Sequence, residues 1–155
     1  MNKNYIHVYN NLINYTRNKD LYKNLDRSDN FSDRLILFLL HFSFFLKNFK
    51  NEQNKLVLQE IYDFNSRQLE LSIREIGYGD QSINKKMKDY INLFHSMVSE
   101  IHFWDDLSKS DKLKKISTFL SDFQNNEELL EYFDLFNSNL SKKTLNSYLK
   151  SVSNP

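Results

Sequence analysis

Both glycines of the chain lie in one short stretch, residues 72–82, and this concentration limits the folds open to the sequence. With 2 Gly and 1 Pro among 155 residues, the chain has too few turn-forming residues for a many-stranded protein. The sequence therefore predicts an all-α fold. Within the stretch, Gly77 suits the left-handed conformation that ends many helices, and Asp80 or Ser82 can cap the next helix. We expect a helix, a tight corner and a second helix.

Apolar residues recur at helical spacing along most of the chain. This spacing predicts helices over roughly residues 5–15, 21–25, 32–49, 52–76, 83–104, 110–122, 126–137 and 141–152. The expected caps are Asp29 or Ser32 for the third helix, and Ser110 and Ser141 for two of the last three. On the fourth helix, Ile73 and Ile76 are expected to complete the buried stripe. No repeat or flexible linker is evident, so residues 1–155 are expected to form a single helical bundle.

The composition excludes several classes of function. A hydrophobic content of 40%, with 13 Phe and 9 Tyr, is typical of a folded protein. A net charge of +1 is too balanced for bulk affinity to nucleic acid, so no nucleic-acid partner is expected. The absence of cysteine excludes a disulfide framework and thiolate metal sites, which suits a reducing cytoplasm. Residues 1–9 lack the hydrophobic region of a signal peptide, so we expect them to be retained.

The most apolar run, residues 35–46, is interrupted by His41 and Ser43. It is shorter than the roughly 20 residues that span a bilayer. A helix that is apolar on nearly every side favours the buried centre of a bundle over an interfacial membrane element. Within such a helix, His41 is expected to be a core histidine bonded to a neighbour.

Patterns of catalysis and metal binding are missing. Gly77-Tyr78-Gly79 resembles the opening of a dinucleotide fingerprint, but Ser82 stands at the third glycine position and a helix precedes it. His95 and His102 share a helix face at a separation of about 10 Å, too far to bind one metal ion. No nucleophile or acid–base set emerges, so we expect no enzyme activity, no metal and no cofactor.

Charged residues surround the glycine corner. Arg74, Glu75 and Asp80 are followed by Lys85, Lys86 and Lys88 at the start of the next helix. Positive charge there opposes the helix dipole, and this small cost favours a binding role, for acidic lipid headgroups or an acidic partner. A purely architectural turn with a solvated face is the alternative.

At this corner the sequence resembles the ubiquinol-cytochrome c chaperone family, whose most recognisable stretch reads Leu-Arg-Glu-hydrophobic-Gly-hydrophobic-Gly-Asp before a basic helix start. Residues 73–80 and 85–88 match that stretch. Residues 29–34, which lead into the apolar run ending at His41, are similar to the family's Asp, Arg and Leu-His helix. The resemblance also covers acidic positions at Asp63 and Glu70, whereas Gln68 and residues 95–97 depart from the family pattern.

The resemblance covers about residues 21–94 and does not extend to the last third of the chain. We therefore expect a family-like core over residues 21–104 and a helical C-terminal extension over 105–155. The resemblance further implies an assembly chaperone that binds newly made cytochrome b during biogenesis of the ubiquinol-cytochrome c reductase complex, respiratory complex III. The expected binding surface comprises Arg74, Glu75, Gly77, Tyr78, Gly79, Asp80, Lys85, Lys86 and Lys88.

Arg34, His41, Asp63 and Glu70 are candidates for a structural or functional core, in which Arg34 could pair with Asp33, Asp63 or Glu70. A helper assembly factor and a peripheral position at the inner face of the respiratory membrane also follow from the resemblance. The alternative function is a helical domain that binds a small ligand or lipid, such as a quinone, or haem through His95 or His102.

Overall fold

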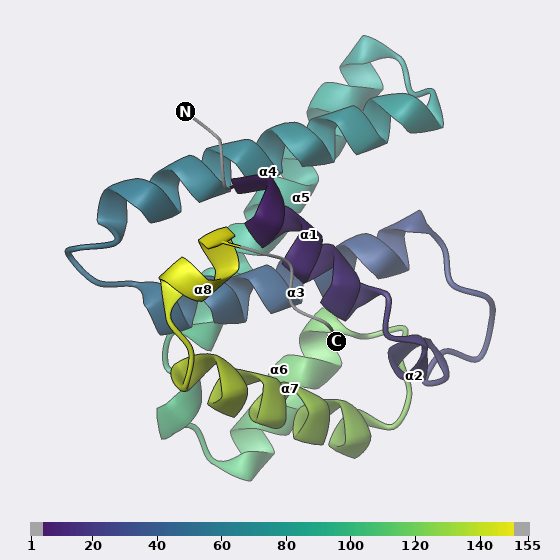
Figure 1. The fold of residues 1–155 in the computed structure, drawn as a ribbon. Coiled ribbons are helices and arrows are strands. Elements are labelled where there is room, and N and C mark those ends of the chain that lie inside the picture. The colour runs from purple at the N-terminus through teal and green to yellow at the C-terminus, as the bar shows by residue number, and fades with distance from the viewer. Residues whose placement is uncertain (1–4, 151–155) are drawn as a thin grey trace.

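A computed structural model describes residues 5–150, and over that range the chain forms α-helices and one short 3-10 helix without a strand (Figure 1). This confirms the all-α prediction. The helices are α1 (Tyr5–Thr16), α2 (Lys19–Tyr22), α3 (Phe31–Phe49), α4 (Lys55–Ile76), α5 (Asp80–Ile101), η1 (Trp104–Asp106), α6 (Lys109–Phe119), α7 (Asn126–Ser141) and α8 (Leu145–Lys150).

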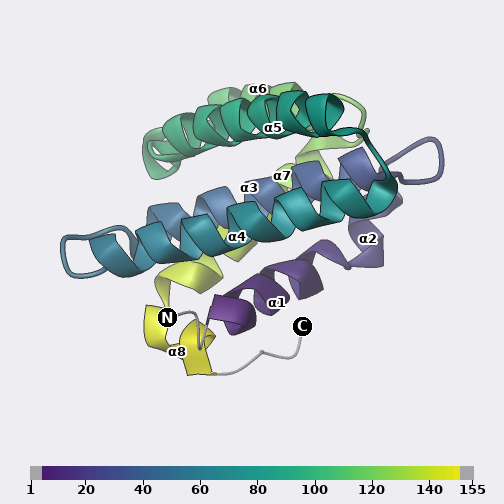
Figure 2. The same ribbon diagram turned by 90° about the horizontal axis from the view of Figure 1, so that it is seen from above.

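Helix α3 forms the centre of the bundle. It packs against α1, α5 and α7, and Figure 2 shows it between α5 on one side and α1 on the other. Its side chains are apolar on nearly every face, so they are buried in several directions at once; Leu37, Leu40, Phe44 and Phe45 are fully buried. The prediction that the most apolar run forms the buried centre is confirmed.

The helices after residue 105 share this core. The ring of Phe44 on α3 stacks on Phe133 of α7 at 5.5 Å and meets Trp104 edge-on at 5.1 Å. Tyr148 of α8 packs edge-on against Phe45 at 5.4 Å. Aromatic rings bury large areas in such arrangements, so the C-terminal helices stabilise α3 directly.

Helix ends differ from the predictions where local hydrogen bonds decide them. Helix α4 begins at Lys55, not at residue 52, because residues 51–54 form a turn in which the Asn54 side chain donates to Phe49 O. The fifth helix ends at Ile101 and Trp104 belongs to η1. Ser141 ends α7 instead of starting the last helix, and Val152 lies outside the described residues.

The predicted caps of α3 and α6 are wrong. Asn30, not Asp29 or Ser32, caps α3: its side chain accepts from Asp33 N while the Asp33 carboxylate accepts from Asn30 N. This reciprocal pair satisfies two N–H groups at once, an advantage over a single cap. Ser108 caps α6 through Asp111 N, two residues before the predicted Ser110.

Candidate functional site

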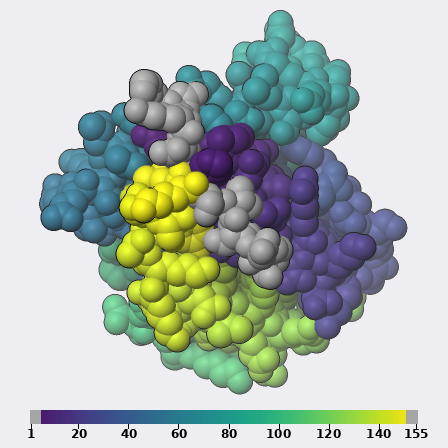
Figure 3. Space-filling model, viewed as in Figure 1, coloured from purple at the N-terminus to yellow at the C-terminus, as the bar shows by residue number. Residues whose placement is uncertain are grey.

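The turn between α4 and α5 projects from the body of the molecule. We call residues 71–88, which comprise the end of α4, the turn and the start of α5, the α4–α5 corner. In Figure 1 this segment extends past the other helices, and Figure 3 shows it as a protrusion on the surface. The protrusion is anchored from within by Ile73 and Ile83, which are both buried.

The two glycines of the corner play different roles. Gly77 ends α4 in the left-handed conformation, with φ at 99°, and its N–H donates to Arg74 O. Gly79 lies in extended backbone, with φ at −69°, which any residue can adopt. It is also the N-cap of α5, which begins at Asp80 without a side-chain cap, so the prediction of a cap by Asp80 or Ser82 is wrong.

The charges of the corner are only partly paired. Arg74 bonds Asp80 at 3.3 Å and lies 3.9 Å from Glu70; Asp80 is largely exposed and the other two side chains are about half exposed. The Lys86 ammonium lies 5.0 Å from the centre of the Tyr78 ring, a cation–π contact. Lys85, Lys88 and Glu75 are exposed and form no ion pair with any residue between 5 and 150. The corner therefore presents free cations next to a partly exposed aromatic ring.

Apolar side chains are also exposed at the corner. Leu71, Ile76 and Tyr78 retain 52%, 47% and 39% of their accessible surface. The prediction that Ile76 completes the buried stripe is therefore wrong, because α4 has by then passed beyond the helices that cover Ile73. Leu71 lies in the sequence between the buried Leu69 and Ile73, out of phase with the buried stripe of α4. This position is the sequence signal that could have identified Leu71 as exposed.

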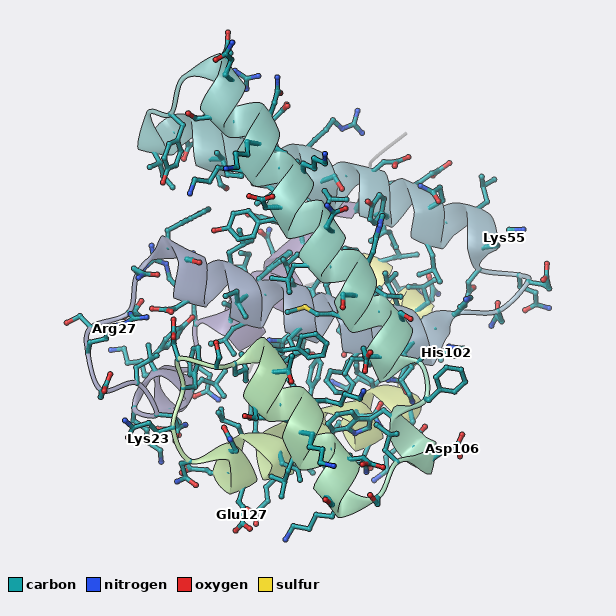
Figure 4. The ribbon with its side chains drawn as sticks, turned by 180° about the vertical axis from the view of Figure 1, so that it is seen from behind. Lys23, Arg27, Lys55, His102, Asp106 and Glu127 are labelled. Carbon is teal, nitrogen blue, oxygen red and sulfur yellow. The ribbon has the colours of Figure 1, made fainter. Side chains whose placement is uncertain are left out.

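The second predicted set, Arg34, Asp63 and Glu70, is not brought together. Arg34 pairs with Asp29 at 3.0 Å, Asp63 accepts from Gln59 and Glu70 lies beside Arg74. The buried carboxylate is instead Asp33, which Arg27 binds through both terminal nitrogens at 2.6 and 3.1 Å. This pairing holds the pKa of Asp33 below its usual value. Figure 4 shows Arg27 on the loop that leads to α3.

His41 is a hydrogen-bonded core histidine. It is fully buried, and its Nδ1 lies 2.6 Å from Leu37 O and its Nε2 2.6 Å from the Tyr132 hydroxyl. Burial disfavours the charged ring and lowers its pKa from 6.5 to about 4. A neutral imidazole surrounded by Tyr15, Phe133 and Phe136 joins α3 to α7 and is not accessible to a partner.

A groove lies at the opposite end of the α4–α5 pair. The two helices diverge from the corner, so that Lys55 at the start of α4 and His102 just after the end of α5, both labelled in Figure 4, lie apart at the open end. The groove there measures about 1030 Å³, and α3 also contributes to its wall. It is lined by Leu46, Lys50, Asn51, Glu52, Lys55, Leu58, Gln59, Tyr62, Phe94, His95, Val98 and His102.

The candidate haem ligands both line this groove, but they differ in their surroundings. His95 Nε2 is hydrogen-bonded to the Tyr62 hydroxyl at 3.1 Å, and His102 stacks edge-on against the exposed Phe103. Within the described part of the chain, no three His, Asp or Glu side chains meet as ligands for one metal ion. Among residues 5–150, no helix combines the length and apolar character that crossing a bilayer requires.

Comparison with known proteins gives one result. The family model for the ubiquinol-cytochrome C chaperone matches residues 23–116, more than half of the chain, from the segment before α3 into α6. The match includes the whole α4–α5 corner and extends past residue 104, where the family-like core was expected to end. No curated protein and no solved structure matches the chain. The chain belongs to the ubiquinol-cytochrome c chaperone family.

Proposed function

We propose that the protein is a non-enzymatic assembly chaperone of respiratory complex III that binds newly made cytochrome b through the α4–α5 corner. Membership of the family supports the assembly role. The observation that carries the choice of surface is the corner itself, which projects from the body while it exposes Leu71, Ile76 and Tyr78.

The corner combines the two properties that a nascent membrane protein requires of its binding partner. Its exposed apolar side chains can cover part of an apolar segment that has not yet inserted, because burial of that surface removes both from water. Lys85 and Lys88 remain available for acidic side chains of the client or for acidic headgroups of the membrane. The corner is thus suited to a client at the membrane surface.

The groove between the diverging ends of α4 and α5 extends this proposal. It has an apolar floor that includes Leu46, Leu58 and Phe94, and Lys50 and Lys55 lie along its wall. An amphipathic or apolar helix can occupy a groove of this kind. We place one client segment at the corner and a second in the groove, with a helper factor as a further partner and the chaperone peripheral to the inner face of the respiratory membrane.

The test is recovery of cytochrome b with the tagged protein from gently solubilised, crosslinked cells. Two variants separate the contributions of charge and apolar surface: Lys85→Glu with Lys88→Glu, and Leu71→Ser with Ile76→Ser. Each is expected to reduce recovered cytochrome b at least fivefold, because each removes one of the two properties without removing a buried side chain.

The control variants change residues of the same kind elsewhere on the surface. Lys109→Glu with Lys114→Glu makes the same change of net charge on α6, and Leu135→Ser removes an apolar residue that is 63% exposed on α7. Both controls should recover cytochrome b as the wild type does, with folding of all variants verified by circular dichroism. Equal recovery by the corner variants would refute the corner as the contact, and absence of cytochrome b from the wild-type sample would refute the client.

A further inference from the structure

A second cavity, separate from the groove, lies where α1, α3 and α4 meet. It measures about 410 Å³, within the range of pockets that hold small molecules. Helix α1 supplies Tyr9 and Ile13, the first half of α3 supplies Phe31, Leu35 and Phe38, and α4 supplies Asn65, Leu69 and Ser72. Most of the wall is therefore apolar or aromatic.

Asn65 is the unusual residue of this wall. Only 3% of the residue is exposed, yet neither Nδ2 nor Oδ1 has a hydrogen-bond partner among residues 5–150. Buried amides almost always have partners, because an unpaired one loses its bonds to water without replacement. A buried amide that faces a cavity with its donor and its acceptor both unused indicates a ligand that supplies the complementary pair.

The rim of the cavity is positively charged. Arg17, Lys19 and Arg34 line it together with one carboxylate, Asp29, which is bonded to Arg34 at 3.0 Å. Arg17 and Lys19 make no ion pair within the described range of the chain. The Tyr22 hydroxyl donates to Thr16 O at 2.7 Å and so fixes the wall beside these two cations. The rim is thus suited to an anionic group.

We propose that this cavity binds a small amphipathic anion of the N-acyl amino acid type. Its acyl chain lies against the apolar wall, its amide bonds the Asn65 side chain as donor and acceptor, and its carboxylate lies at the rim with Arg17 and Lys19. This ligand class follows from three independent features of one cavity: an apolar wall, an unpaired buried amide and unpaired cations. It does not depend on the proposed client or on the corner.

The test uses isothermal titration calorimetry on the purified full chain with N-decanoylglycine as the probe. Two comparison ligands each lack one group: tridecanoate has the same chain length without the amide, and N-decanoylglycine methyl ester has no negative charge. The wild type is expected to bind one equivalent of N-decanoylglycine at least tenfold more tightly than either. A short-chain quinone, which is neutral and only accepts hydrogen bonds, is expected to bind more weakly as well.

Variants then assign the groups. Asn65→Leu should remove the preference for N-decanoylglycine over tridecanoate while the free protein unfolds at the same temperature or higher, since an unpaired buried amide is lost. Arg17→Gln should weaken the binding of N-decanoylglycine and of tridecanoate at least threefold, and should leave the binding of the methyl ester unchanged. The control is Arg67→Gln, which changes an exposed residue of α4 outside the cavity and should alter the binding of none of the three ligands.

Failure of the wild type to distinguish the three ligands would overturn the proposal without any variant. A preference that persists in Asn65→Leu, or tighter binding of the quinone, would also overturn it. Because no client is present in the titration, these outcomes are independent of the recovery of cytochrome b, and either proposal can fail alone.

Discussion

The body around α3 and the α4–α5 corner place similar residues in opposite environments. Around α3, apolar side chains are buried and His41 bonds two partners. At the corner, Leu71 and Ile76 are exposed and the ion pair of Arg74 with Asp80 lies in solvent. Burial makes contacts energetically significant, whereas an exposed ion pair contributes little. The body therefore determines stability, and the corner is free to serve another purpose.

The largest expected contrast lies within one turn of α4. Ile73→Ala should lower the free energy of unfolding by about 4 kcal/mol, because Ile73 is fully buried and its removal leaves a cavity. Ile76→Ala, three residues later on a half-exposed side chain, should lower it by less than about 0.5 kcal/mol. Denaturant titration monitored by circular dichroism measures both. Similar losses for the two variants would show that Ile76 belongs to the stabilising core as Ile73 does.

The second contrast is between a buried and an exposed histidine. The pKa of His41 is about 4 in the folded protein and 6.5 when its surroundings are removed, so the unfolded state binds a proton that the folded state does not. The stabilisation from a neutral His41 is complete above pH 6.5 and is lost as the pH falls toward 4. This amounts to about 3 kcal/mol between those limits.

Unfolding titrations between pH 7 and pH 4 measure this effect. His41→Phe should abolish most of the pH dependence in this window, because it removes the titrating ring and keeps an aromatic side chain. The control is His102→Gln, which removes an exposed histidine and keeps His41 in its buried site. A wild-type stability that stays constant from pH 7 to 4, or a His41→Phe variant with the wild-type slope, would contradict the assignment to His41.

Helical periodicity was sufficient to predict the fold class and the central position of α3. The pattern of residues 35–46 is apolar in every direction, and only a helix with neighbours on several sides buries such a surface. The glycine corner was also predictable, because 2 glycines in 155 residues leave few places for a tight turn between long helices.

Partners of polar groups could not be predicted in the same way. Asp33 pairs with Arg27 rather than Arg34, and Lys47 reaches Asp105 at 2.6 Å across the bundle. Such choices depend on how loops and distant helices pack, which spacing along one helix does not determine. The exposure of Ile76 escaped prediction for the same reason: its phase matches Ile73, and only the position of the neighbouring helices distinguishes them.

The smallest predicted effects are changes in the free energy of unfolding that have opposite signs at the two glycines of the corner. Gly77→Ser should lower the free energy of unfolding by about 1 kcal/mol, because φ at 99° is unfavourable for any residue with a Cβ. Gly79→Ser should raise it by roughly 0.5 kcal/mol, since its extended backbone accepts a side chain and serine reduces the freedom of the unfolded chain. The new hydroxyl can also cap α5, which has no side-chain cap.

Thermal and denaturant unfolding of the two serine variants measure these opposite signs. A Cβ at either position meets no atom within 4 Å, so backbone conformation alone separates the two variants. If both serine substitutions destabilise the protein equally, then the corner is stabilised by contacts that are not evident from its exposed surface. If the signs differ as expected and Gly79→Ser nevertheless fails to recover cytochrome b, then Gly79 is required for client contact and not for folding. The variant would be more stable than the wild type and yet unable to bind.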